Sequence, residues 1–412
     1  MHVLIVGAGV GGLSLAQSLR KQNLSFEIFE RDADADARPQ GWALAIHSIV
    51  DKLASTFPPD MPDLRQSTNH LAPLELPAQL GMYIPRLEGR WGFQDSPNFP
   101  LIRAERRRLR NWLATNIPVQ WGRRVQRIEH DDHGVSVYFE DGGSAKGDIL
   151  VGADGINSVV RQNLLHRPAS DLLNVVPLST VVGELELSGE AFKRQLALGH
   201  SGYMLIRPDL GFIAFAGLHV VQADGRSARY YWNFMQADDG IARPDHWLHV
   251  ASQQDKLDHV LAAVRGLPPQ FREIFERTRT ENIRPETHIW RDLDLGAHGG
   301  LPAGRVVLMG DSAHAMTPFR GEGGFHTLVD TLALGQALGE LAGNARFNDI
   351  AAVQRAVAGY NSAMLNRAVQ AVRASRNLHA DAQRFGPDGK PVVVKMVPLP
   401  DTPIRLAGDN EG

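Results

Sequence analysis

The chain begins with a short apolar run that glycines follow directly. Residues 2–6 (His-Val-Leu-Ile-Val) are rich in β-branched side chains, a pattern typical of a buried strand. Beyond the glycines, apolar residues recur at Leu13, Leu15 and Leu19, the spacing of one helix face. The pattern therefore predicts a strand, a tight turn and a helix at the start of the chain.

The turn between that strand and helix contains Gly7, Gly9, Gly11 and Gly12. Gly7 allows the tight turn, Gly9 lets a pyrophosphate approach the backbone, and Gly12 lets the helix lie close to the strand. The free N–H groups at the start of the helix then point at the phosphates. We expect these four glycines to bind a dinucleotide cofactor.

A second strand is predicted at residues 25–29, and Glu30 follows it, 23 residues after Gly7. A carboxylate about 20 residues beyond such a turn accepts hydrogen bonds from a ribose 2′-hydroxyl. Glu30 therefore favours FAD or NAD over NADP, whose 2′-phosphate would face the negative charge. The alternative is an α/β unit without nucleotide, in which Glu30 is solvated.

Two later strands also end in polar turns. Residues 148–151 lead into Gly152 and Asp154, and residues 305–309 lead into Gly310 and Asp311. Ligands of open α/β sheets bind at the carboxyl ends of strands, so we expect Asp154 and Asp311 at the cofactor.

Between these two strand ends, the pattern changes to the period-two alternation of a sheet. Strands are predicted at 175–187, 202–207, 211–218 and 228–235. In the last strand Tyr230, Trp232 and Phe234 share a face, and Tyr231, Asn233 and Met235 share the other. An aromatic face suits an apolar ligand, so we expect Phe215, Tyr230 and Trp232 to contact the substrate. The alternative is that this face packs an ordinary core.

Charged clusters are few, and their patterns do not indicate a polyanionic partner. Five arginines lie between 103 and 110, in a stretch predicted as one helix over 102–113. The net charge of −3 and the apolar stripe of Leu109, Trp112 and Leu113 favour a solvated helix face over a nucleic-acid site. At the central sheet the only candidate cation is Arg207, at a strand end. The His and Asp residues at 130–133 fit a turn, and no metal is expected.

The length and composition indicate an ordinary two-domain protein. The chain has 412 residues and no cysteine, which excludes disulfides, thiolate metal sites and a flavin attached through Cys. No apolar run approaches the about 18 residues that cross a membrane. We expect a cytoplasmic enzyme, a monomer or homodimer, with no nucleic-acid or membrane partner. A long helix is predicted over 350–384, with an irregular tail from 385.

Three motifs of this sequence resemble those of the class A flavoprotein monooxygenases, the para-hydroxybenzoate hydroxylase-like family. They occur over residues 1–330 in the same order as in that family. They are Gly7-x-Gly9-x-x-Gly12 with Glu30; Gly152-Ala153-Asp154-Gly155 with Ser158 and Arg161; and Gly310-Asp311-Ser312-Ala313-His314 with Pro318, Gly321, Gly323 and Asp330.

The resemblance implies an α/β fold, with a Rossmann-type FAD-binding domain, an inserted β-sheet substrate domain and C-terminal helices. The discontinuous FAD-binding domain would comprise 1–70, 101–170 and 280–345. The substrate domain would comprise 71–100 and 171–279, and a C-terminal helix and tail would fill 346–412.

The resemblance also implies an activity. A monooxygenase of this family would hold FAD without a covalent link, use NADPH or NADH as a transient reductant, and react through a flavin C(4a)-hydroperoxide. We expect it to hydroxylate or epoxidise a largely apolar aromatic or polycyclic compound, in secondary metabolism or aromatic catabolism. Oxidation, Baeyer–Villiger insertion, flavin-dependent reduction and a non-redox cyclase remain alternatives.

Site roles are carried over from the family by position. Arg38 and Arg106 would flank the pyrophosphate, Asp311 would hold the ribityl chain, and Pro318 would lie over the reactive edge of the flavin. Further cofactor contacts are expected from Arg31, Gly321, Gly323, Gly324 and Phe325. Phe325 replaces an Asn that many members carry, so that side-chain contact is lost. His47 is a candidate base for ionising a phenol.

Overall fold

A parallel sheet of five strands surrounds the first strand of the chain in the computed structural model, which describes residues 1–412 except 40, 86, 377–383, 386–390, 393–394 and 408–412. The strand order is β18-β11-β1-β2-β7, so β1 occupies the centre. Its apolar residues are buried on both faces, as expected for a parallel sheet covered by helices. The strands are β1 (His2–Val6), β2 (Ser25–Phe29), β7 (Val119–Gln120), β11 (Ile149–Gly152) and β18 (Val306–Leu308).

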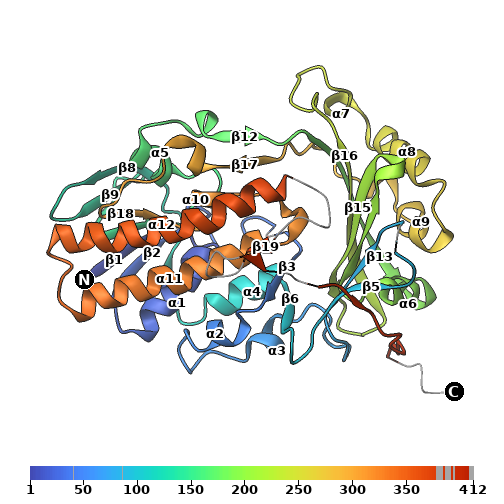
Figure 1. Ribbon diagram of the computed structural model, residues 1–412, viewed down its shortest axis with the longest axis horizontal. Coiled ribbons are helices and arrows are strands. Elements are labelled where there is room, and N and C mark those ends of the chain that lie inside the picture. Colours follow the sequence, from blue (N-terminus) through green and yellow to red (C-terminus); the bar gives the residue numbers. More distant parts are fainter. Residues whose placement is uncertain (40, 86, 377–383, 386–390, 393–394, 408–412) are drawn as a thin grey trace.

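Three helices cover one side of this sheet: α1 (Val10–Lys21), α11 (Gly323–Gly343) and α12 (Ile350–Ser375). Figure 1 shows α11 and α12 running side by side along the lobe. A glycine of α11 lets α1 approach closely, because a Cβ on Gly335 would lie 2.3 Å from Ser18 Oγ and 3.2 Å from Ser18 Cβ. The remaining elements of this lobe are α2 (Val50–Ala54), α3 (Leu64–Thr68), α4 (Arg106–Leu113), α5 (Val159–Leu165), α10 (Asp311–His314), β8 (Val125–His130), β9 (Val135–Phe139) and β10 (Ser144–Gly147).

The second lobe is built on a seven-stranded sheet of order β13-β16-β15-β14-β4-β5-β21 (Figure 1). Its pairs are antiparallel apart from β14 with β4. The strands are β4 (Gln79–Tyr83), β5 (Trp91–Gln94), β13 (Leu178–Ser188), β14 (Gly202–Arg207), β15 (Phe212–Val221), β16 (Ser227–Ala237) and β21 (Val397–Pro398).

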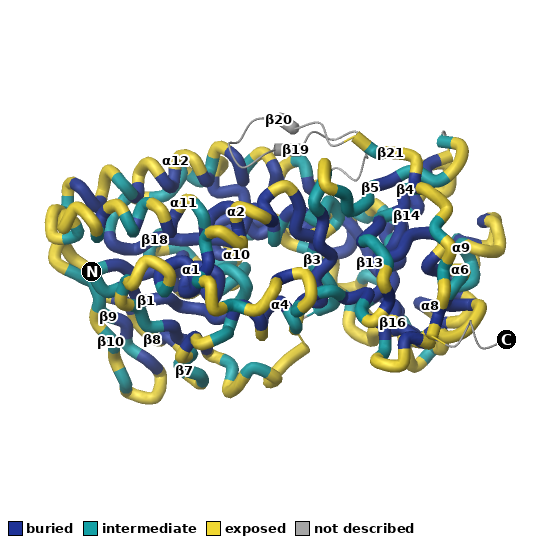
Figure 2. Tube along the Cα trace, turned by 90° about the horizontal axis from the view of Figure 1, so that it is seen from below, coloured by how far each residue is buried: buried dark blue, intermediate teal, exposed yellow. Residues whose placement is uncertain are grey.

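Helices pack on the outer face of this sheet and form a second core with it. They are α6 (Gly189–Leu198), α8 (Gln253–Val264) and α9 (Pro269–Glu276). In Figure 2 the buried residues follow the strands and inner helix faces, and the exposed residues follow the outer turns. Smaller elements are α7 (Trp247–Val250), β12 (Leu173–Val175), β17 (Arg291–Leu293), β19 (Arg384–Phe385), β20 (Pro391–Val392) and single-turn helices at Ala169–Asp171, Pro208–Leu210, Thr280–Asn282, Leu295–His298 and Pro318–Arg320.

The predicted helix over 102–113 is wrong in its first part. Residues Leu101–Glu105 form β6, which pairs antiparallel with β3 (Ala43–His47), and Arg103 lies opposite Ala45. Helix α4 starts only at Arg106, because Glu105 caps it by accepting hydrogen bonds from the backbone N–H groups of Arg107 (3.2 Å) and Arg108 (2.7 Å).

The C-terminal prediction also needs correction. Helix α12 ends at Ser375, and residues 377–383 of the predicted helix lie outside the described residues. The tail is not wholly irregular, because β21 adds to the edge of the seven-stranded sheet beside β5. The predicted domain boundaries stay a prediction. Among the described residues, no helix is both long and apolar enough to cross a membrane.

Candidate active site

A cleft of about 1200 Å³ extends from the carboxyl end of the parallel sheet to the inner face of the seven-stranded sheet. One end is lined by Gly7, Gly9 and Glu30, and the other by Met204 and Tyr231. Residues far apart in the sequence therefore share one space.

The glycines of the turn at the first end of the cleft meet three different steric requirements. Gly7 has φ +105°, and a Cβ there would lie 2.4 Å from the Ala153 carbonyl oxygen. A Cβ on Gly12 would lie 1.9 Å from the Gly7 carbonyl oxygen, so helix α1 could not pack against the turn. A Cβ on Gly9 would meet no atom within 4 Å. Gly7 and Gly12 are therefore required by the fold, whereas Gly9 leaves room in the cleft itself.

Glu30 and Arg110 hold this turn from two sides. Glu30 is buried, and its Oε2 accepts a hydrogen bond from the Ala8 N–H at 2.8 Å. Arg110 is also buried, and its Nε donates to the Ala8 carbonyl at 3.0 Å. Burial lowers the pKa of Arg110, and the charges of Glu30 and Asp32 oppose that shift. Arg110 has no predicted role in the sequence, although its position four residues after Arg106 was a usable signal.

Three other predicted cations line the rim of the cleft: Arg31, Arg38 and Arg106. Arg38 donates from Nε to Asp32 at 2.6 Å, and the side chain is about half exposed. Arg106 is exposed at the start of α4.

The two acidic strand ends differ in what their carboxylates contact. Asp154 accepts hydrogen bonds from Ser158 Oγ (2.5 Å) and the Val159 N–H (2.7 Å), so it caps α5. Burial raises the pKa of Asp154, and these hydrogen bonds oppose the shift. Asp311 is exposed to the cleft, and no donor among the described residues bonds to its side chain. Asp311 is therefore the carboxylate available to a ligand.

A buried network supports the turn before Asp311. Asp330 is fully buried and accepts hydrogen bonds from the Gly310 N–H (2.8 Å) and, with its other oxygen, from Arg367. His314 Nε2 lies 2.6 Å from the same Asp330 oxygen as the Gly310 N–H. Burial by itself raises the pKa of Asp330, but His314 and Arg367 outweigh it and hold the value at about 2. The ionised Asp330 therefore fixes the turn at Gly310, whose φ is +60°.

The predicted flavin loop lines the middle of the cleft with Pro318, Gly321, Gly323 and Gly324. Phe325 does not line it: the ring is buried and stacks on His47, with centroids 4.7 Å apart. His47 ends β3, lines the cleft and has its Nδ1 3.0 Å from Ser48 Oγ. The loop thus brings backbone, not the Phe325 side chain, to the cleft.

The face of β16 that lines the cleft is the opposite of the one predicted to contact the substrate. Tyr231, Asn233 and Met235 line the cleft together with Phe215 of β15. Tyr230 and Trp232 are fully buried in the core on the outer side, where the Trp232 Nε1 donates to Thr278 Oγ1 at 2.8 Å. Tyr230 and Trp232 therefore do not reach the cleft, whereas Phe215 lines it, and its contact with the substrate stays a prediction.

The cation at this end of the cleft is Arg103, not Arg207. Arg207 pairs with Asp209 at 2.5 Å at the end of β14 and does not line the cleft. Arg103 points from β6 into the cleft and donates to the Tyr231 hydroxyl at 2.9 Å. The sequence signal for this was the alternation in β6, where Ile102 and Ala104 face the core and Arg103 between them does not.

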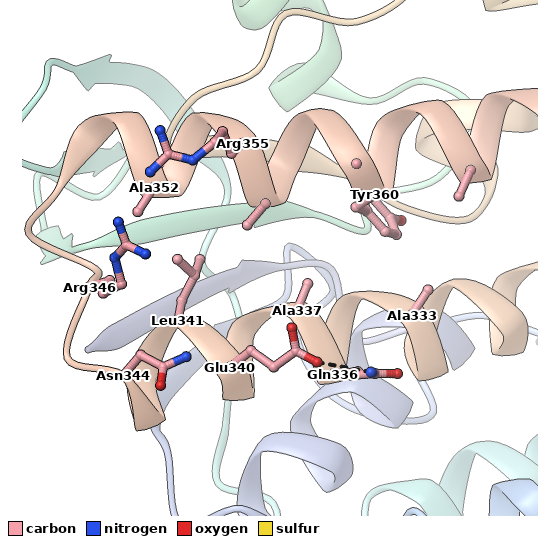
Figure 3. A pocket seen from close by; sticks show the side chains of 13 residues that line it. Ala333, Gln336, Ala337, Glu340, Leu341, Asn344, Arg346, Ala352, Arg355 and Tyr360 are labelled. Atoms are coloured by element: carbon pink, nitrogen blue, oxygen red, sulfur yellow. Dashed lines mark hydrogen bonds between the residues drawn. The ribbon is translucent and has the colours of Figure 1, made fainter.

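A smaller depression of about 520 Å³ lies between α11 and α12, and Figure 3 shows the side chains that line it. Its polar groups bond locally, for example Gln336 Nε2 to Glu340 Oε1 at 2.9 Å (Figure 3). It contains no strand end and no glycine turn, so we assign the active site to the large cleft.

The first end of the cleft fits a dinucleotide on its own geometry. The open space at Gly9 admits a group that no side chain fills, and α1 starts there without a side-chain cap or an acidic residue in its first turn. Its N–H groups are therefore open to an anion such as a pyrophosphate. Fold and cleft together define a dinucleotide-binding protein with a second, apolar ligand pocket.

Comparisons with known proteins identify the family. A model of the NAD(P)-binding Rossmann-like domain matches residues 5–71. The FAD-dependent monooxygenase thnD of Trichoderma harzianum is 55% identical over 409 residues, which cover 99% of this chain and 100% of that protein. The chain therefore belongs to the FAD-dependent monooxygenases. Its cofactor is FAD, its reductant is a nicotinamide nucleotide, and it acts on a small molecule.

Solved structures show the same fold. An FAD-containing monooxygenase from Photorhabdus luminescens, described as putative, superposes with a TM-score of 0.68 at 23% identity, covering 92% of this chain and 98% of that one. HpxO of Klebsiella pneumoniae, complexed with FAD and uric acid, superposes with a TM-score of 0.66 at 21% identity, covering 91% and 87%. The predicted Rossmann-type fold with an added sheet and C-terminal helices is thereby confirmed.

Proposed function

We propose that this monooxygenase hydroxylates or epoxidises a largely apolar aromatic or polycyclic compound bound at the far end of the cleft. The observation that carries the proposal is the lining of that end. Most of the side chains there are apolar, and the polar ones are Arg103, Tyr231, Asn233 and His47. Pockets of this kind hold apolar ligands that a few polar groups orient. The apolar members are Leu80, Met82, Phe93, Phe99, Met204, Ile206, Phe215 and Met235.

We propose that the first end of the cleft holds the ADP half of FAD. Gly9 and the start of α1 would receive the pyrophosphate, with Arg38 and Arg106 at the rim. Glu30 would accept a bond from the ribose, as its buried carboxylate already orients the Ala8 N–H. Support comes from the open space at Gly9.

The flavin half would lie along the middle of the cleft. Asp311 would bind the ribityl hydroxyls, since its carboxylate faces the cleft without a described protein donor. The backbone between Pro318 and Gly324 would face the isoalloxazine ring. Asp154 would act indirectly, because its oxygens already cap α5.

Bound FAD supplies the activation of O₂, which protein side chains do not provide. The chain must orient the substrate and exclude water. Phe319, next to Pro318, packs edge-on against Trp290 with centroids 5.2 Å apart, so the flavin loop and the substrate lobe meet in an apolar contact. His47 remains the candidate to take a proton from a phenolic substrate at its imidazole.

The test is NAD(P)H oxidation by the FAD-loaded enzyme with two panels, small hydroxybenzoates and larger apolar phenols or polyenes. We expect coupled stimulation by the larger compounds, with one oxygen atom from isotopically labelled O₂ in the product. Stimulation by hydroxybenzoates alone would contradict the proposed substrate class. A product without labelled oxygen would favour an oxidase or reductase, and turnover without NAD(P)H oxidation a cyclase.

We also propose that the enzyme works in the cytoplasm as a monomer or homodimer. The absence of cysteine and the modest net charge of −3 support this setting. Cell fractionation and light scattering on the purified protein test the two parts separately.

A further inference from the structure

We propose that Arg103 and Tyr231 form a subsite for an oxyanion of the substrate, a phenolate or a carboxylate carried by the apolar ring system. This inference rests on the proposed function, since it concerns the compound that fills the same pocket. It adds a charge requirement that an apolar lining alone does not predict.

The first observation is a buried cation without a counterion. The Arg103 side chain is only 8% exposed, and among the described residues no carboxylate lies within ion-pair distance of it. Its Nε has no hydrogen-bond partner in the described part of the chain. Burying an unpaired charge is unfavourable, because the ion loses its hydration without gaining a counterion. An anion that enters the cleft would remove this cost.

The nearest acid is already engaged. Glu105 lies two residues from Arg103 on the same side of β6, but its oxygens accept the N–H groups of Arg107 and Arg108 that start α4. One of these oxygens also lies 3.2 Å from His219 Nε2. The positive charge of Arg103 is instead felt by the buried His70, where it adds to burial in lowering the pKa to about 3.

Tyr231 shapes the second half of the subsite. Its hydroxyl accepts a hydrogen bond from Arg103 Nη2 at 2.9 Å, so its own proton remains to be donated to another acceptor. Gly217 makes room for the ring, because a Cβ there would lie 2.5 Å from Tyr231 Cζ. A guanidinium N–H and a phenolic O–H thus converge at one place in the cleft.

The remaining walls explain why the anion should belong to a ring compound. The Arg103 guanidinium carbon lies 5.7 Å from the centroid of Phe215, which lines the cleft beside Met204 and Met82. These three side chains are apolar and bind no polar group, so the apolar body of the ligand would lie against them. One oxyanion at the Arg103–Tyr231 subsite would therefore fix the direction in which the apolar body lies.

The test measures equilibrium binding to the FAD-loaded enzyme without NAD(P)H, so the result does not depend on turnover. The probes are 2-naphthoate, its neutral analogue naphthalene-2-carboxamide, and 2-naphthol. In the wild type we expect 2-naphthoate or 2-naphthol to bind at least about tenfold more tightly than the carboxamide, as charge-assisted hydrogen bonds predict. The tighter of the two identifies carboxylate or phenolate as the preferred oxyanion.

Variants assign that preference to Arg103. Arg103→Gln should abolish the contrast between the two acidic probes, 2-naphthoate and 2-naphthol, and the carboxamide, and Arg103→Lys should retain part of it. Arg207→Gln is the matched control, because that arginine lies on the same lobe but pairs with Asp209 outside the cleft. It should bind all three probes as the wild type does.

Three outcomes would overturn the subsite. These are equal or weaker binding of both acidic probes relative to the carboxamide in the wild type, no binding of either acidic probe, and a contrast that persists in Arg103→Gln. If Arg103→Gln loses FAD, the relative affinities of the three probes in the wild type and in Arg103→Lys decide whether Arg103 forms the subsite. An enzyme that binds the oxyanion but transfers no oxygen would contradict the proposed function and leave the subsite standing.

Discussion

The indole of Trp42 lies parallel to the phenol ring of Tyr231, with ring centroids 4.1 Å apart and planes inclined by 2°. Trp42 precedes β3 in the nucleotide lobe, and Tyr231 belongs to the seven-stranded sheet. Both line the cleft. The stack therefore joins the two lobes and fixes the tyrosine ring from one side.

Trp42→Leu should weaken substrate binding by loosening Tyr231. An aromatic pair contributes about 0.5–1.5 kcal/mol beyond its buried area, so we expect KM for the organic substrate to rise by about three- to tenfold. Steady-state kinetics at saturating FAD measure this. Trp247→Leu on α7, outside the cleft, is the control, and an unchanged KM in Trp42→Leu would contradict the role given to the stack.

Gly9→Ala and Gly12→Ala should separate cofactor binding from folding. Gly9 has φ −81° and ψ −171°, which any residue adopts, and its Cβ would point into open space. We expect Gly9→Ala to keep the Tm of the apoprotein and to lose at least about tenfold in FAD affinity, as a methyl would stand where the pyrophosphate approaches. Gly12→Ala should lower the free energy of unfolding by about 1–3 kcal/mol through overpacking. Normal FAD affinity in Gly9→Ala would place the pyrophosphate elsewhere.

Glu30→Ala should weaken FAD retention. It removes the proposed ribose acceptor and also the carboxylate that binds the Ala8 N–H. A hydrogen bond to a charged group contributes about 1.5–3 kcal/mol, so the Kd for FAD should rise by about ten- to a hundredfold in fluorescence titrations. Glu27→Ala is the matched control, because Glu27 lies on β2, the strand that leads to Glu30, but bonds to His2 and Gln120 away from the cleft. Equal effects of the two substitutions would show that Glu30 has no special role.

His70 should make the protein less stable as the pH falls below neutrality. Burial lowers its pKa to about 3, and the ring is held between the Leu218 carbonyl (3.0 Å) and Ser201 Oγ (2.8 Å). As the pH falls below 6.5, the ordinary pKa of histidine, His70 binds a proton in the unfolded chain. In the folded chain its imidazole stays neutral until about pH 3. Stability is therefore lost as pH falls through this window, by on the order of 2 kcal/mol between pH 7 and pH 5.

His70→Gln should reduce that pH dependence, since glutamine does not titrate. Urea unfolding at pH 7 and pH 5 gives the comparison, and the exposed His133→Gln should behave as the wild type. A slope in His70→Gln as steep as in the wild type would show that other groups carry the effect.

The sequence predicted the structure best at positions where only one type of residue satisfies the local physical requirement. The strand before Gly7 and the turn at Gly12 are dictated by apolar runs and by contacts that admit no Cβ. The strand ends at Asp154 and Asp311 follow from the same logic, and both line the cleft. These features depend on residues that are close together in the sequence, so the sequence pattern predicts them.

The substrate end was harder to predict, because its decisive contacts are between distant residues. Alternation correctly grouped Tyr230 with Trp232 and Tyr231 with Asn233, but both faces of β16 are aromatic. Which face meets the cleft depends on helices α6 and α9 covering the other one. The place of Arg103 on a strand was hard to predict for a similar reason, because the side chain of Glu105, not periodicity, sets the start of α4.

The addition of β21 to the edge of the substrate sheet makes the order of synthesis matter. Ribosomes release the N-terminal end first, at about 5–20 residues per second. The central strand β1 is therefore made long before its neighbour β11 at 149–152, and the sheet edge at 397–398 is made after every strand of the five-stranded sheet. Met396, which lines the cleft, arrives with it. A nascent chain therefore has every strand of the five-stranded sheet once β18 has been made, whereas its substrate chamber lacks a wall until residues 396–398 have followed.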